Sequence, residues 1–320
     1  MLKIITLKLT NFKHSGDFIG DDVCVEINIL DKFFSVDKKI KKNKIIACQD
    51  AVGQFFTDGK IFNPEITIAV IEKDLIYNDV GNISGKLKID LEKTISQIVN
   101  YQVEVFEKRG KQATKNKKAI FEMTLEASVG PAISYVPETI DGWLVGKDSK
   151  GKGVSIPSFL KVRIDKRDTE HEYISILEGP LYGQKLSVKY RDDGLSYFVV
   201  NNPQTSAALA TYSILKRVFS LAGKKYSCAD YLKAPWEKGL YDIEMPDSPH
   251  PGGINYVNIA PHAKVWFRVG HSGARYIHTG RRSAGCITLT EQNRWEEVWN
   301  ILVKARKGDG VSVGVLEVIE

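Results

Sequence analysis

A chain of 320 residues corresponds to two domains, or to one large one, at about 150 residues per domain. Its hydrophobic fraction of 43% and charged fraction of 26% are those of ordinary globular proteins, which excludes wholesale disorder, collagen and coiled coil. The net charge of +6 is well short of a nucleic-acid-binding signature, so we expect no nucleic-acid partner. Four cysteines in 320 residues are too few for a disulfide framework, and they show no CxxC or other zinc spacing.

The sequence contains no candidate membrane span, because no stretch approaches about 18 consecutive apolar residues. Its first residues, MLKIITLKLTNFKHSGD, carry lysines throughout and have neither the apolar core nor the cleavage site of a signal peptide. We therefore expect synthesis in the bacterial cytoplasm without a signal peptide, and any outward transport to use a specialised exporter.

Residues 1–128 predict strand after strand. LKIITLKL alternates apolar and polar residues with period 2, as a half-buried strand does. Similar segments follow, separated by turn residues: VCVEINIL, KIIACQ, EITIAVIE, GKLKIDL, NYQVEVFEKR and KKAIFEMTLEAS. Short strands at this spacing indicate a mainly β fold that begins with an antiparallel β-sandwich.

The segments LKLTNFKHSGDFIGDDVCVEINI and EITIAVIEKDLIYNDVGNISGKLKIDL resemble the calcium- and lipid-binding β-sandwich of protein kinase C and synaptotagmin. Aspartates in two loops of that family bind calcium. The resemblance implies this role for Asp17 and Asp22 in the first loop and for Asp74 and Asp79 in the second. Glu72 stands where the family has an aspartate. The alternative is a packing or targeting sandwich whose acidic loops are simply solvated.

Five lysines lie between residues 38 and 44. They could bind anionic lipid or phosphates, which would give a peripheral membrane contact, but their alternation with neighbouring residues favours a solvated hairpin. The run contains no interleaved aromatic residues, which argues against single-stranded nucleic acid.

Two prolines and two glycines mark residues 129–142 as a linker, and the remaining residues 143–320 as a second, β-rich domain. Strand-like segments there include FLKVRID, EYISILEG, KLSVKY, GLYDIEM, AKVWFRV and ARYIHTG, and VSVGVLEVIE closes the chain. SAALATYSILKRVFSLAGKK fits a helix or a strand equally well.

The segment TLTEQNRWEEVWNILVKARKG predicts one clear helix. Its apolar residues recur on one stripe, at Trp295, Val298, Trp299, Leu302 and Ala305. Thr288 and Glu291 have the spacing of a capping box, and Thr290 is the alternative N-cap. Gly308 follows as the expected C-cap.

The segment ARYIHTGRRSAGCITLT carries the residues of a nucleophilic site. His278 ends a short apolar strand and Cys286 follows eight residues later. An imidazole near a cysteine can take the thiol proton and later protonate a leaving amine. Gly285 would let a substrate carbonyl approach the backbone, whose N–H groups can stabilise an oxyanion. His271 is the competing base.

YIHTG followed by SAGCITL resembles the signature of the YkuD-type L,D-transpeptidases, and KAPWEKGLYDIEMPDSPHPGGINY is similar to that family's T-P-x-G-x-Y-x-I segment. The resemblance implies that Cys286 is the nucleophile and His278 the general base, and that neither a metal nor an organic cofactor is required. It gives Ser283 and Gly285 the role of shaping the turn and the oxyanion hole. The substrate-binding candidates are Arg281, Arg282, Tyr241 and His271.

The chain departs from that signature at two positions. Ala284 stands where the family has a second histidine, and Thr288 where an arginine often follows the cysteine. The loop between His278 and Cys286 is also shorter than in typical members, as in a divergent branch that includes interbacterial toxins. These departures put the specificity for the acyl acceptor in doubt.

The resemblance implies a cysteine acyltransferase that acts on peptidoglycan stem peptides as an L,D-transpeptidase, a D-amino-acid exchange enzyme or an L,D-carboxypeptidase. The alternatives are a catalytically inactive binding or structural protein and a cysteine peptidase that cuts proteins. Because the substrate lies outside the cytoplasm, we expect action in the periplasm or cell wall after specialised export. We hypothesise a toxin effector with a secretion-machine component or an immunity protein as partner; a phage-encoded wall enzyme is another route.

Overall fold

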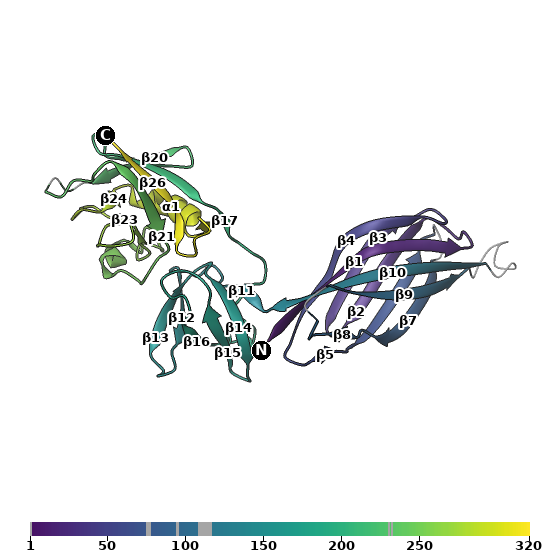
Figure 1. Ribbon diagram of the computed structural model, residues 1–320. Coiled ribbons are helices and arrows are strands. Elements are labelled where there is room, and N and C mark those ends of the chain that lie inside the picture. Colours follow the sequence, from purple (N-terminus) through teal and green to yellow (C-terminus); the bar gives the residue numbers. More distant parts are fainter. Residues whose placement is uncertain (1, 75–77, 94–95, 108–116, 230, 232) are drawn as a thin grey trace. The chain divides into compact units, whose positions relative to one another are not determined.

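The chain divides into two compact units, Met1–Ala132 and Ile133–Glu320. Their boundary lies within the predicted linker 129–142, of which a large part is strand (Figure 1). Strand β10 (Lys118–Pro131) ends there and β11 (Ile133–Tyr135) begins two residues later. The computed structural model describes residues 2–74, 78–93, 96–107, 117–229, 231 and 233–320.

The first unit is an antiparallel β-sandwich. Its remaining strands are β1 (Lys3–Gly16), β2 (Asp22–Ile29), β3 (Lys32–Lys39), β4 (Ile45–Thr57), β5 (Ile61–Phe62), β6 (Glu65–Glu72), β7 (Asp79–Lys86), β8 (Ile89–Asp90) and β9 (Gln97–Phe106). Two four-stranded sheets have the orders β4-β1-β10-β9 and β3-β2-β6-β7, and β5 pairs with β8. The run of lysines predicted as a hairpin occupies the end of β3 and the turn into β4.

The period-2 alternation of the sequence explains this sandwich. Leu7 and Leu9 of β1 are fully buried, while Lys8 between them is exposed. Val25 and Ile68 of the other sheet belong to the same hydrophobic cluster. Because each fully buried aliphatic side chain contributes about 1.5–3 kcal/mol, the inner faces of the two sheets hold the unit together.

The second unit begins with a six-stranded antiparallel sheet of order β11-β14-β15-β16-β12-β13. Its strands after β11 are β12 (Trp143–Lys147), β13 (Gly153–Pro157), β14 (Lys161–Arg167), β15 (His171–Ile176) and β16 (Lys185–Lys189). Glu178, which follows β15, forms a buried ion pair with Arg306 at 2.9 Å and so ties this sheet to the rest of the unit.

An eight-stranded sheet makes up the rest of the second unit. Its strands are β18 (Ala208–Ser213), β19 (Val218–Leu221), β20 (Lys224–Ala229), β21 (Gly239–Glu244), β22 (Phe267–Arg268), β23 (Tyr276–Thr279), β24 (Ile287–Leu289) and β26 (Ser312–Ile319), in the order β21-β26-β18-β19-β20-β24-β23-β22. A bridge between Ile243 and Val269 joins the two ends of this order, so the sheet nearly closes on itself. The short strands β17 (Thr205–Ser206) and β25 (Ala305–Arg306) pair beside it.

The ambiguous segment SAALATYSILKRVFSLAGKK forms strands, namely β18, β19 and the start of β20. Arg217 and Ala222 have positive φ angles of 50° and 49°, and Gly223 has 76°. These left-handed residues turn the chain between strands and cannot continue a helix.

The predicted helix is present but short. Helix α1 (Trp295–Leu302) buries Trp295, Val298, Trp299 and Leu302, the first four residues of the predicted stripe, and Ala305 lies in β25 (Figure 1). The 3₁₀ helix η3 (Gln292–Arg294) precedes it and η2 (Pro251–Tyr256) lies earlier. No helix among the described residues has the length and apolar character to span a membrane.

The predicted caps of this helix are wrong. Thr288 lies within β24, and the Thr290 hydroxyl donates to the Ser227 carbonyl at 3.1 Å. The C-cap of α1 is Val303 rather than Gly308. The capping-box spacing gave a false signal because the helix begins at Trp295, seven residues after Thr288 and beyond the reach of that side chain.

Candidate functional site

The candidate site lies where β23 and β24 pair in parallel. The register sets His278 opposite Thr288 and Ile277 opposite Ile287. Cys286 comes directly before β24, two residues before Thr288. Residues paired across a ladder have side chains on the same face, so His278 and Thr288 share one face of the sheet. The eight-residue spacing in the sequence therefore brings the backbones of His278 and Cys286 near each other, on β23 and beside β24.

The His278 ring is buried and held on both nitrogens. Nδ1 lies 2.8 Å from the Thr279 carbonyl oxygen and Nε2 lies 3.0 Å from Thr288 Oγ1. A carbonyl can only accept, so Nδ1 carries the proton. Burial lowers the pKa of His278 to about 4, and the charge of His250 adds to this effect. At neutral pH the imidazole is therefore neutral, with its Nε2 lone pair accepting from the Thr288 hydroxyl.

The Cys286 thiol is also buried, with 9% of the residue exposed. Its Sγ donates to the Ala274 carbonyl oxygen at 3.8 Å, and within the described residues no hydrogen bond joins it to His278. Burial raises the pKa of the Cys286 thiol, against lowering effects of a Tyr276 backbone hydrogen bond and the Arg275 charge. The resting pair is thus a neutral thiol and a neutral imidazole, and the proton must move when the sulfur reacts.

The turn before Cys286 is fixed by Ser283. The Ser283 hydroxyl donates to the Cys286 carbonyl at 2.7 Å and accepts from the Gly285 N–H at 3.1 Å. Gly285 has φ +116°, a conformation that favours glycine, and a Cβ added there would meet no atom within 4 Å. The backbone beside the nucleophile is therefore open, although the Gly285 N–H is already engaged by Ser283 rather than aimed at an oxyanion.

The arginines of the loop and Tyr241 lie in different surroundings. Arg281 and Arg282 are exposed, and the Arg281 backbone N–H donates to the Tyr256 hydroxyl at 3.2 Å. Tyr241 belongs to β21, where its hydroxyl donates to the Glu237 carbonyl at 3.0 Å. Its ring meets Trp236 edge to face, with centroids 5.7 Å apart. None of these contacts joins the three residues to Cys286.

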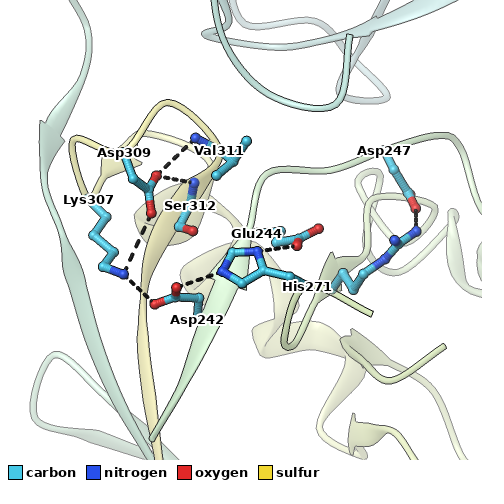
Figure 2. Close-up of polar contacts among 9 residues, drawn as sticks. Asp242, Glu244, Asp247, His271, Lys307, Asp309, Val311 and Ser312 are labelled. Carbon is cyan, nitrogen blue, oxygen red and sulfur yellow. Dashed lines mark hydrogen bonds and ion pairs between the residues drawn. The ribbon is translucent and has the colours of Figure 1, made fainter. Parts of the chain in front are cut away.

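His271, the competing base, faces carboxylates instead of the thiol. Figure 2 shows its ring between Glu244, 2.8 Å from Nδ1, and Asp242, 2.8 Å from Nε2. Lys307 contacts the other oxygen of Asp242 at 2.6 Å. The two carboxylates raise the pKa of His271. A ring whose two nitrogens both donate to carboxylates has no lone pair for a thiol proton, so His278 is the better-placed base.

Sequence reasoning missed the group behind His278. Trp266 stacks on His278 with centroids 3.9 Å apart, and its other face stacks on His250 at 4.4 Å. His250 pairs with Asp247 at 3.0 Å, and Asp247 also binds Arg268 at 2.6 Å. The only signal was the Asp-x-x-His spacing inside PDSPHP. The stack limits the movement of the His278 ring.

The first unit holds a cluster of three carboxylates, Glu72, Asp74 and Asp79, with ligand atoms within 4.8 Å of one another. Glu72 is 2% exposed and its Oε2 has no hydrogen-bond partner among the residues that the structure describes. Burial, with the charges of Asp74 and Asp79, raises the pKa of Glu72 to about 7. Gly20 lies against it, since a Cβ there would overlap Glu72 Oε1. An unpartnered buried carboxylate beside two others fits a hard cation.

The four predicted calcium ligands separate into two groups. Asp74 and Asp79 belong to this cluster, together with Glu72, which the resemblance had treated as a departure. Asp17 accepts from the Lys118 backbone N–H at 3.0 Å, and Asp22 pairs with Lys39 at 3.6 Å. Neither belongs to the cluster found among the described residues.

No protein-family model and no curated protein matches the chain. Among solved structures it is similar to a C2 domain of plant Extended Synaptotagmin 1, at 13% identity and a TM-score of 0.24, covering 40% of this chain and 94% of that one. It is also similar to human GIVD cytosolic phospholipase A2, at 10% identity and a TM-score of 0.25, covering 59% and 32%. At these TM-scores the similarity supports no conclusion, and the sandwich is defined by its own strand order.

Proposed function

We propose that the second unit is a cysteine acyltransferase or hydrolase acting on peptidoglycan stem peptides, with Cys286 as nucleophile and His278 as general base. The observation that carries the proposal is the fixed tautomer of His278. Its Nδ1–H is bound to the Thr279 carbonyl at 2.8 Å, and its strand pairs with β24, which Cys286 directly precedes. A neutral imidazole held in this way can accept a thiol proton.

The reaction follows from these groups. The Cys286 sulfur attacks the carbonyl of the third stem residue as His278 takes the thiol proton, and the imidazolium then protonates the departing D-alanine amine. The resulting thioester passes its acyl group to an amine, which gives cross-linking or exchange, or to water, which gives carboxypeptidase activity. The space beside the Gly285 Cα, where a Cβ would meet no atom within 4 Å, leaves room for the carbonyl. The stem-peptide substrate comes from the resemblance of YIHTG and SAGCITL.

Mass spectrometry of muropeptides tests this proposal. The full chain is incubated with isolated peptidoglycan, beside Cys286→Ala and, as a matched control, Cys24→Ala in the other unit. Loss of D-alanine from tetrapeptide stems, or new linked or exchanged products, is expected from wild type and Cys24→Ala only. Unchanged muropeptides with a thiol that alkylates readily would point to another acyl substrate, including proteins. Unchanged muropeptides with an inert thiol would favour a binding or structural protein.

A second candidate function concerns the sandwich, for which we propose calcium binding at Glu72, Asp74 and Asp79. The buried, unpartnered Glu72 Oε2 supports it. A bound cation would satisfy this oxygen and offset the repulsion among the three carboxylates. Titration calorimetry with calcium chloride tests it: heat is expected from wild type and from Asp17→Asn, and none from Asp79→Asn. Equal heats from the two variants would refute this site.

For the cellular role, we propose that the sandwich is a docking or targeting module and that the chain reaches the periplasm or wall through a specialised exporter. The division of the chain into two compact units supports a separate role for the sandwich. A secretion assay with and without each such exporter tests it. Retention of the protein inside cells that have every exporter intact would contradict delivery.

A further inference from the structure

The Thr288 hydroxyl occupies the lone pair that the proposed reaction needs. Thr288 is fully buried, and its Oγ1 lies 3.0 Å from His278 Nε2. Because Nδ1 donates to the Thr279 carbonyl, Nε2 of the neutral ring is an acceptor and Thr288 is the donor. Cys286 has no direct hydrogen bond to His278, and a hydroxyl stands on the nitrogen that would receive its proton.

The chain brings that hydroxyl close to both groups. Thr288 pairs with His278 across the parallel ladder, and Cys286 precedes it by only two residues. Two residues of chain span at most about 7 Å, so the Cys286 backbone lies near Thr288. The Cys286 Sγ now donates to the Ala274 carbonyl over 3.8 Å, and the relay requires this side chain to turn away from that carbonyl.

We propose that Thr288 is a proton-relay residue, through which His278 takes the proton of Cys286. The inference rests on the proposed function and names a step within it. The S–H bond of Cys286 breaks and its proton binds Thr288 Oγ1, while the Thr288 hydroxyl proton binds His278 Nε2. The sulfur keeps the electron pair. The products are a thiolate and an imidazolium, and Thr288 remains a neutral hydroxyl.

The surroundings of His278 make a relay more favourable than a preformed ion pair. The ring is 7% exposed and stacked on Trp266, with the titratable His250 on the far side of the indole. From the segment before β24, the nearest titratable group along the chain is Cys286, two residues before Thr288. A charged pair in such a site would be costly before a substrate arrives, whereas a hydroxyl bridge holds the neutral groups in line until the sulfur reacts.

Alkylation of Cys286 by iodoacetamide, followed by mass spectrometry of the peptide that contains it, tests the relay without any wall substrate. Thr288→Val removes the hydroxyl at nearly constant volume, and Thr288→Ser keeps it. The matched control is Thr290→Val, two residues further along the chain. This variant loses the hydrogen bond from the Thr290 hydroxyl to the Ser227 carbonyl. We expect Thr288→Val to react about 10-fold or more slowly at pH 7, and Thr288→Ser and the control to stay within about threefold of wild type.

The pH profile separates a relay from a purely structural role. In wild type, assisted alkylation should require neutral His278 and fall as pH drops through about 4, the pKa that burial gives this ring. In Thr288→Val the fall in alkylation rate near pH 4 should be absent. The rate should then follow only the ionisation of the Cys286 thiol. Near-UV circular dichroism verifies folding. If Thr288→Val is unfolded, Thr288→Ala compared with Thr288→Ser makes the same test.

Two outcomes would overturn the inference, and they differ in what they leave standing. If Thr288→Val reacts as fast as wild type, or faster, the hydroxyl is a bystander or a block, and the Cys286–His278 pair itself is untouched. If the wild-type Cys286 does not alkylate across the whole pH range, the proposed nucleophile fails and the relay fails with it.

Discussion

His278 in the second unit and Glu72 in the first are both buried titratable groups, and their partners differ. His278 has a carbonyl on one nitrogen and a hydroxyl on the other. Glu72 has two carboxylates as neighbours and leaves Oε2 without a partner. The comparison shows that a buried titratable group with hydrogen-bond partners is held ready for proton transfer. A buried carboxylate that lacks such partners carries a charge that must be neutralised by a cation or a proton.

The two groups also respond to acid in opposite directions. The pKa of His278 is lowered to about 4 in the folded protein. The stability that its neutral form contributes is therefore fully present at a pH above its pKa in the unfolded chain, and is lost as pH falls toward 4. The pKa of Glu72 is raised to about 7, so the first unit gains stability as pH falls from about 7 toward the unfolded value. Mild acid should thus strengthen the sandwich and weaken the second unit.

The largest expected effect comes from His278→Asn, which removes the proposed general base of the second unit. Asparagine can replace the hydrogen bonds of the ring but cannot accept a proton at neutral pH. We expect the rate of muropeptide conversion to fall about 100-fold or more. The rate is measured by mass spectrometry, with Thr290→Val as the folded control. Full activity in His278→Asn would assign the base to another residue.

An intermediate effect is expected from Glu72→Gln in the sandwich. Without metal, the uncharged amide should stabilise the protein at pH 8 by about 1–3 kcal/mol, since one pKa unit corresponds to about 1.4 kcal/mol. Calcium should raise the melting temperature of wild type but not of this variant. Thermal unfolding in calcium and in EDTA measures both. A variant less stable than wild type in EDTA would show that Glu72 is already satisfied.

The smallest effect is expected from His271→Asn, because this ring is exposed. The pKa of His271 is raised in the folded protein. Its contribution to stability is therefore fully present at a pH below its pKa in the unfolded chain, and is lost as pH rises through its pKa in the folded protein. Exposed pairs contribute less than about 1 kcal/mol, and the ring is 56% exposed. We expect a slightly lower melting temperature at pH 6, no change at pH 9, and unchanged thiol reactivity. A large loss of reactivity would restore His271 as the base.

The strands of the sandwich could be predicted because one face of each is buried and the other solvated. LKIITLKL and KKAIFEMTLEAS became β1 and β10, whose alternation follows their position in a sheet with one inner face. The mainly β fold is confirmed. The segment around β18 and β19 stayed ambiguous because the turn at Arg217 lacks the usual glycine or proline signal, and only Gly223 marks the turn at Ala222.

Parts of the candidate sites were beyond sequence reasoning because they depend on register. The pairing of His278 with Thr288 follows from a parallel ladder that no local pattern specifies, so Thr288 was noticed only as a departure and as a cap. The Trp266–His250 stack likewise joins segments that lie apart in the chain. Glu72 was visible in the sequence, but its burial and its unpartnered oxygen were not.

The central claim is that Cys286 carries the acyl group, and intact-protein mass spectrometry tests it most directly. Wild type and Cys286→Ala are mixed briefly with a purified tetrapeptide-stem muropeptide and quenched in acid, which preserves a thioester. The account predicts that wild type gains the mass of the muropeptide less D-alanine, located at Cys286 after digestion, and that the variant gains none. Release of D-alanine by Cys286→Ala at the wild-type rate, or an adduct on another residue, would contradict it.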